Sequence, residues 1–229
     1  MSKVVASQNE DVNTFVKVLK SMAPNKRTID VFSDWIKCAA YAFINATNYS
    51  QQRENEYKET LQMYSKEDQM KFPRLLALVA DGLTKNYCDF LGEAYMGCDM
   101  GNAAAGQFFT PYSVSLATAK ISIGKVKDMD SIITIGEPSC GSGGMIIAAA
   151  EVLRDQGFPF QKNMLAFMGD IDIDAVYMSI IHCSLLGIPA VIQHTNTLTQ
   201  EVYAEFETPA CAMWLVRERY EAQCRKENK

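Results

Sequence analysis

Apolar side chains along the first hundred residues recur at intervals of three and four, the spacing that places them on one face of a helix. Three such runs begin at Phe15, Val31 and Phe72, and the last continues to Tyr95. The segment 51–66 between them is polar and charged, which indicates an exposed helix or an elongated connection. We therefore expect residues 1–105 to form a helical N-terminal region.

The pattern changes after Met100, where residues 101–106 are small and suggest a loop or hinge. A helical pattern follows through Ala119. Thr110 is suited to cap that helix, with Pro111 at its first position, where a missing N–H is harmless.

Short apolar runs then alternate with helical patterns. Strands are predicted over Ser131–Ile135, Met164–Met168 and Ala190–Gln193. Helices between them should begin near Met145 and span about Ala175–Leu186. This alternation predicts a parallel α/β sheet with right-handed crossovers within a second domain, residues 106–229. The stretch Phe206–Val216 could supply one further strand.

Composition limits the cellular setting and the partners. Hydrophobic residues make up 48% and charged residues 21%, as in ordinary globular proteins. The sequence shows no membrane-length apolar run and no secretory signal pattern, so we expect a cytoplasmic protein without a membrane partner. The net charge of −5 indicates that any binding to DNA by the chain alone is weak. Seven scattered cysteines and two histidines predict no metal site.

The strongest chemical signal directly follows the first predicted strand. It is the glycine-rich turn Glu137-Pro138-Ser139-Cys140-Gly141-Ser142-Gly143-Gly144. Glycines let a ligand approach the backbone closely, and the next helix offers unpaired N–H groups. A crevice at the carboxyl ends of parallel strands is the expected ligand site. A tight structural turn is the alternative interpretation.

An acidic residue after the second strand supports a nucleoside ligand. Asp170 follows Gly143 at close to the roughly 20-residue spacing of an acid that bonds a ribose. Ile171 would then form an apolar wall for adenine. Asp172 is a rival for the ribose role, although it and Asp174 could instead cap the following helix.

The glycine turn resembles the first motif of adenine-N6 DNA methyltransferases, especially modification subunits of type I restriction-modification systems. Residues 106–111 resemble their upstream cofactor-contacting motif, and residues 89–95 the helix before it. Residues 196–198 resemble the third motif, whose polar residue lies near the cofactor adenine. The resemblance implies DNA methylation chemistry, S-adenosylmethionine as the cofactor, and a partial Rossmann-like methyltransferase sheet. The implied cofactor-binding residues are Phe108, Phe109, Thr110, Pro111, Glu137, Pro138, Ser139, Cys140, Gly141, Ser142, Gly143, Asp170, Ile171, Asp172 and Asn196.

The family's reaction motif, Asn/Asp-Pro-Pro-Tyr/Phe, is missing from this sequence. No two prolines are adjacent and none follows Asn or Asp; Thr208-Pro209-Ala210-Cys211 stands nearest the expected place but lacks the required groups. The family sheet also needs further strands after Leu198, so an open sheet edge should be covered by the helical region, a protein partner or a second copy.

Three hypotheses follow for the function. The chain binds S-adenosylmethionine without catalysis, as a regulatory, scaffolding or anti-restriction protein; it is an active methyltransferase, alone or completed by a partner; or the turn is a structural relic. Catalytic residues stay unassigned.

Overall fold

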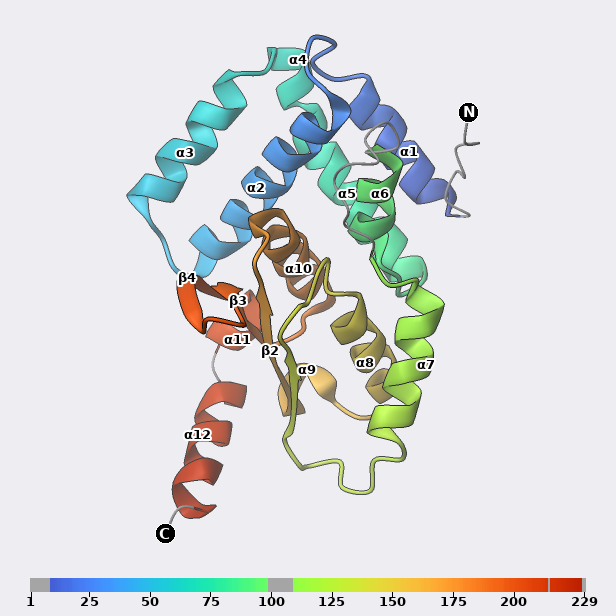
Figure 1. The fold of residues 1–229 in the computed structure, drawn as a ribbon, viewed down its shortest axis with the longest axis vertical. Helices are drawn as coiled ribbons and strands as arrows, with labels where there is room; N and C mark the ends of the chain where they lie inside the picture. The colour runs from blue at the N-terminus through green and yellow to red at the C-terminus, as the bar shows by residue number, and fades with distance from the viewer. Residues whose placement is uncertain (1–8, 99–108, 214, 228–229) are drawn as a thin grey trace.

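The computed structural model describes residues 9–98, 109–213 and 215–227 (Figure 1). The expected domain boundary at 105/106 and the candidate Phe108 lie outside these residues. Within them, the N-terminal region folds into helices as predicted: α1 (Glu10–Lys20), α2 (Thr28–Thr47), α3 (Gln51–Gln62), α4 (Lys66–Gln69), α5 (Lys71–Lys85) and α6 (Phe90–Cys98).

Aromatic side chains fill the centre of this helical region. The ring of Phe15 on α1 contacts Trp35 on α2 and Phe90 on α6 edge-on, at centroid distances of 5.0 and 5.6 Å. All three residues are essentially inaccessible to solvent. The Trp35 indole donates to the backbone oxygen of Phe72 at 3.0 Å, which satisfies its buried N–H.

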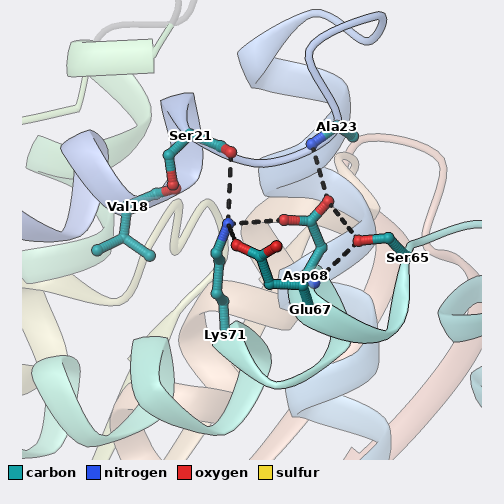
Figure 2. A network of polar contacts seen from close by, with 7 residues as sticks. All are labelled: Val18, Ser21, Ala23, Ser65, Glu67, Asp68 and Lys71. Carbon is teal, nitrogen blue, oxygen red and sulfur yellow. Dashed lines mark hydrogen bonds and ion pairs between the residues drawn. The ribbon is translucent and has the colours of Figure 1, made fainter.

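A polar network joins the α1–α2 loop to α4 and α5 (Figure 2). The buried carboxylate of Asp68 accepts from the Ala23 N–H at 3.3 Å, the Ser65 hydroxyl at 3.1 Å and Lys71 at 2.8 Å. Lys71 also donates to the Ser21 carbonyl at 3.4 Å. Because Ala23 has a φ of +41°, which is unusual for a residue with a side chain, this network holds a strained loop in place.

The prediction of one long helix over Phe72–Tyr95 is wrong, because the helical structure is interrupted between α5 and α6. The Asp89 side chain accepts from the Gly92 N–H at 3.0 Å, and its backbone oxygen accepts from Glu93. A side chain that satisfies the N–H groups of a first turn starts a new helix. The helical spacing of apolar residues continues across the break, so the spacing alone could not reveal it.

Helix α7 (Tyr112–Ile123) begins one residue later than expected. Pro111 occupies the N-cap position, and no side chain caps this end, so the prediction that Thr110 caps a helix starting at Pro111 is wrong. The backbone of Pro111 is extended, with φ −52° and ψ 134°, and its carbonyl accepts from Val114 and Ser115. The α7 helix packs along α8 (Gly144–Asp155).

The described strands form one sheet in the order β1-β2-β3-β4. Strands β1 (Ile133–Glu137), β2 (Met164–Asp170) and β3 (Ala190–Asn196) are parallel, as the alternation predicted. The connections carry α8, the short α9 (Phe160–Asn163) and α10 (Ile173–Leu186). Gly187 ends α10 in the left-handed conformation, with φ 65°.

The fourth strand differs from the prediction. Strand β4 (Glu201–Glu207) pairs antiparallel with β3 through a tight turn. Of the strand expected over Phe206–Val216, only Phe206 and Glu207 are in a strand, as the end of β4. Pro209 starts the short helix α11 (Pro209–Ala212), because proline suits a first helical position; α12 (Leu215–Glu227) follows. In the described part of the chain β1 pairs only with β2 and β4 only with β3, so both are edge strands.

Alternate residues of the central strands face opposite sides of the sheet. Met164, Ala166 and Met168 join the main core with α8 and α10, whereas Leu165 packs with Val191 on the other face near α11 and α12. Figure 1 shows the N-terminal helices at one end of the molecule and α12 at the other.

The helical region and the sheet unit meet where α2 packs on α10. The Ser33 hydroxyl donates to the Asp174 carboxylate, and the Tyr41 and Tyr177 rings meet edge-on at 5.7 Å. Burial raises the pKa of Asp174. None of the described helices is long and apolar enough to cross a membrane.

Candidate functional site

The glycine-rich turn lies between the end of β1 and the start of α8. Gly141 and Gly143 have φ values of +54° and +94°, which residues with a side chain rarely adopt. Gly143 is the N-cap of α8 and its carbonyl accepts from Ile146 and Ile147. The conformation therefore explains why glycine occupies both positions.

The two glycines face different surroundings. A Cβ on Gly141 would lie 3.0 Å from the ring of Phe109, whereas a Cβ on Gly143 would lie 3.1 Å from the Ser179 hydroxyl and 3.6 Å from Met168. Gly141 thus faces the segment before α7, and Gly143 faces the core beneath α10. A side chain at Gly143 would disturb the fold before it filled a ligand site.

Asp170 at the end of β2 holds the turn in place. One carboxylate oxygen accepts from the Gly141 N–H at 2.8 Å and the other from the Asp172 N–H at 2.9 Å. The backbones meet directly as well, since the Cys140 N–H donates to the Gly169 carbonyl at 2.9 Å. The acid and the glycine turn, separate in sequence, are brought together as predicted from parallel-sheet geometry.

A buried histidine contacts the turn from α10. His182 on α10 accepts from the Leu91 N–H at 3.1 Å, and its other ring nitrogen lies 2.8 Å from the Ser142 carbonyl. A neutral ring satisfies both contacts by accepting through Nε2 and donating through Nδ1. Complete burial lowers the pKa of His182, an effect that the nearby Asp89 charge opposes.

A cavity of about 200 Å³ opens beside the turn. Its volume is below the roughly 300–1,000 Å³ of typical small-molecule sites, so it holds only part of a ligand's envelope. The lining residues are Asp89, Phe109, Thr110, Ser115, Ser139, Cys140, Gly141, Ser142, Gly144, Met145, Asp170 and Ala175. Two carboxylates, and no lysine, arginine or histidine, are found in this described lining.

The structure divides the predicted site residues into two groups. The residues that line the cavity are Phe109, Thr110, Ser139, Cys140, Gly141, Ser142 and Asp170. The described candidates outside its lining are Pro111, Glu137, Pro138, Gly143, Ile171, Asp172 and Asn196.

Two of the outlying candidates have local structural roles. Asp172 caps α10 by accepting from the Asp174 N–H at 2.9 Å, in agreement with the capping alternative. Asn196 accepts from the N–H groups of Leu198 and Thr199 at 3.1 and 3.2 Å, and so shapes the β3–β4 turn. Ile171 is 57% exposed beside β2.

Asp89 and Ser115 line the cavity but were not among the predicted site residues. Asp89 is 4% exposed and accepts from the Ser142 hydroxyl at 2.5 Å. Ser115 on α7 is 1% exposed, and its hydroxyl has no hydrogen-bond partner in the part of the chain that the structure describes. An orphaned buried hydroxyl in a cavity is the kind of group that a ligand satisfies.

The lining thiol carries no charge, because burial raises the pKa of Cys140 to about 12. The searched, described residues hold no cluster of histidine, cysteine or carboxylate side chains that could bind a metal ion.

The segment Thr208-Pro209-Ala210-Cys211 is turned into the protein. Thr208 is inaccessible to solvent, and its hydroxyl donates to the Ile188 carbonyl at 2.8 Å and accepts from the Ala190 N–H at 3.0 Å. Cys211 is also fully buried. These side chains anchor the start of β3 and are occupied within the fold.

Comparison with known proteins gives a family match over this region. Residues 87–212, more than half of the chain, match the family described as N-6 DNA Methylase. The methylase subunit of the type I restriction enzyme MpnII from Mycoplasma pneumoniae is 33% identical over 78 residues, which cover 32% of this chain and 14% of that relative.

One solved structure shows the same kind of fold, and a second is more distantly similar. A protein named as a class I S-adenosylmethionine-dependent methyltransferase from Listeria monocytogenes superposes with a TM-score of 0.50 at 14% identity, over 83% of this chain and 55% of that one. A type I restriction-modification methyltransferase subunit from Streptococcus thermophilus gives a TM-score of 0.42 at 14% identity, over 84% and 59%. The chain spans less than two thirds of the length of each of these proteins.

Proposed function

The chain belongs to the N-6 DNA methylase family, and we propose that it binds S-adenosylmethionine in the cavity beside the glycine turn. The family and the Rossmann-like methyltransferase fold both imply this cofactor. When bound, S-adenosylmethionine supplies a methyl group on a positively charged sulfur.

The charge of the cavity carries the proposal. Its described lining holds the carboxylates of Asp89 and Asp170 and no basic side chain. A sulfonium cofactor with an ammonium group is favoured there, whereas a nucleotide with several phosphates would meet two negative charges. The unpartnered Ser115 hydroxyl offers one further polar contact.

Asp170 is the proposed ribose-binding residue. It lines the cavity, and each of its oxygens can accept a second hydrogen bond besides the one from the backbone. Asp172 is the weaker candidate, since it caps α10 and lies outside the cavity lining. Phe109 and Thr110 would close the cavity on the side of α7, and Ile171 and Asn196 would contact the adenine end beyond it.

Methyl transfer by the chain alone is not part of the proposal. Adenine-N6 transfer needs an amide or carboxylate oxygen to polarise the exocyclic amine and an aromatic ring to stack on the extruded base. The sequence lacks the Asn/Asp-Pro-Pro-aromatic motif. The hydroxyl of Thr208 is already hydrogen-bonded to the backbone of Ile188 and Ala190. We therefore propose a cofactor-binding member of the family that acts through a partner.

The second candidate function is an active methyltransferase completed by another subunit. Strand β1 favours it, because its outer edge is unpaired in the described structure and lies directly next to the glycine turn. A strand added there by a partner could place base-binding residues beside the cavity. A regulatory or anti-restriction protein could use the same edge.

Calorimetric titration with S-adenosylmethionine tests the proposed function. The matched pair Asp170→Asn and Asp172→Asn removes one carboxylate at a time from neighbouring positions. We expect Asp170→Asn to weaken binding roughly tenfold or more, as for loss of a hydrogen bond to a charged group, and Asp172→Asn to leave affinity nearly unchanged. The opposite ranking would assign the ribose to Asp172.

Tritium transfer to unmethylated DNA separates binding from catalysis. The chain alone should transfer no label, while addition of a completing subunit should restore transfer if the second candidate is correct. Transfer by the isolated chain would overturn the non-catalytic proposal.

A further inference from the structure

The buried carboxylate of Asp89 contacts other residues of the glycine turn than Asp170 does. Asp170 accepts from the Gly141 N–H, whereas Asp89 accepts from the Ser142 hydroxyl and lies close to Gly144 at the start of α8. The cavity therefore presents two carboxylates, which are held at different residues of the turn.

Asp89 has neutral donors only. Its oxygens accept from the Gly92 N–H at 3.0 Å and the Ser142 hydroxyl at 2.5 Å, and no lysine or arginine pairs with it in the described part of the chain. Asp68, the comparably buried aspartate of Figure 2, also has a serine and a backbone donor but in addition an ion pair with Lys71 at 2.8 Å.

A carboxylate removed from water without a cation is costly, and a cationic ligand group offsets that cost. Asp89 is 4% exposed, yet it lines the cavity, so a ligand there can reach it. The unpartnered hydroxyl of Ser115 lies in the same lining and can donate to an anionic group. A ligand end that carries both an ammonium and a carboxylate matches these two groups.

We propose that Asp89 binds the α-ammonium group of the methionyl part of S-adenosylmethionine, and that Ser115 donates to the adjoining carboxylate. This inference rests on the proposed cofactor function and adds an amino-acid subsite to it. Asp170 serves the ribose, and Asp89 serves the other end of the same ligand.

The test compares S-adenosylhomocysteine with an analogue in which hydrogen replaces its α-amino group. Both lack the sulfonium, so the comparison isolates the ammonium. For the wild-type chain, calorimetry should show affinity falling roughly 10- to 100-fold when the amino group is removed, as expected for a hydrogen bond between charged groups. In Asp89→Asn the two ligands should bind about equally.

Asp68→Asn is the matched control. It removes an aspartate of similar burial with similar partners, but Asp68 is outside the cavity lining. It should destabilise the protein and keep the full difference between the two ligands. In Asp89→Asn the amide oxygen can still accept the Gly92 N–H, so the start of α6 is retained.

The outcomes separate this inference from the proposed function. If the wild-type chain binds neither S-adenosylmethionine nor S-adenosylhomocysteine, the proposed function fails and the subsite fails with it. If the wild-type chain binds both ligands of the pair equally, or if Asp89→Asn weakens both by the same factor, the subsite is overturned while the function stands. Should Asp89→Asn not fold, the wild-type comparison decides alone.

Discussion

Replacement of Gly143 by alanine should destabilise the fold more than replacement of Gly157. Both glycines have positive φ, +94° and +74°, so alanine costs roughly 1–2 kcal/mol at either position through backbone strain. Only at Gly143 does the new Cβ meet a neighbour, the Ser179 hydroxyl at 3.1 Å; at Gly157 the space is open to 4 Å.

The additional cost at Gly143 follows from the role of Ser179. Its hydroxyl donates to the Gly141 carbonyl at 2.9 Å, and moving it away from a new Cβ loses that bond. A hydrogen bond contributes about 0.5–1.5 kcal/mol, so Gly143→Ala should cost roughly 1.5–3.5 kcal/mol in total.

Thermal denaturation followed by circular dichroism measures this difference. For a chain of this size 1 kcal/mol corresponds to a Tm shift of roughly 2–4 °C, so the extra ~0.5–1.5 kcal/mol should make Gly143→Ala melt about 1–6 °C below Gly157→Ala. Equal Tm values, or a lower Tm for Gly157→Ala, would refute the assignment of Gly143 to the packed side of the turn.

Three further substitutions test the buried polar contacts. Burial lowers the pKa of His182 and holds it neutral in the folded state. In the unfolded chain a histidine takes up a proton below about pH 6.5. The stability that this group contributes is therefore complete above about pH 6.5 and is lost as the pH falls below it. The free energy of unfolding of the wild type should accordingly fall up to roughly 1.4 kcal/mol per pH unit more steeply than that of His182→Asn, and parallel denaturation curves across pH 5–7 would contradict this. Thr208→Val leaves the Ile188 carbonyl and the Ala190 N–H without their partner and should cost roughly 1–3 kcal/mol for each in guanidinium denaturation; a variant as stable as the wild type would show that the hydroxyl is dispensable. Trp35→Phe removes the indole that donates to the Phe72 carbonyl and should lower the Tm by a few degrees, an effect whose absence would argue against the indole contact.

The parallel strands could be predicted from the sequence because each is an apolar run with a helix after it. Strand β4 could not be predicted in this way, because most of its side chains are exposed and it has no apolar face that would give a period-two pattern. Its position depends on main-chain pairing with β3 and on the turn that Asn196 stabilises. The break before α6 was missed for a related reason, because one capping side chain, Asp89, outweighs the continuing apolar spacing.

The sequence could predict those residues of the site that directly follow a strand. The glycine turn and Asp170 each follow a parallel strand, and parallel strands end at the same edge of a sheet. Asp89, just before α6, meets the Ser142 hydroxyl from 53 positions away, and His182 on α10 meets the Ser142 carbonyl from 40. Contacts of that kind depend on helix packing and have no local sequence signature.

Calorimetric titration of the wild-type chain with S-adenosylmethionine, beside Gly141→Ala, tests the central claim most directly. A Cβ on Gly141 would lie 3.0 Å from Phe109 and so narrow the cavity itself. We expect saturable binding at one site of the wild-type chain, competition by S-adenosylhomocysteine but not by a dinucleotide, and much weaker binding by a folded Gly141→Ala. No heat of binding at millimolar cofactor, or unchanged affinity in Gly141→Ala, would contradict a cofactor site at the glycine turn.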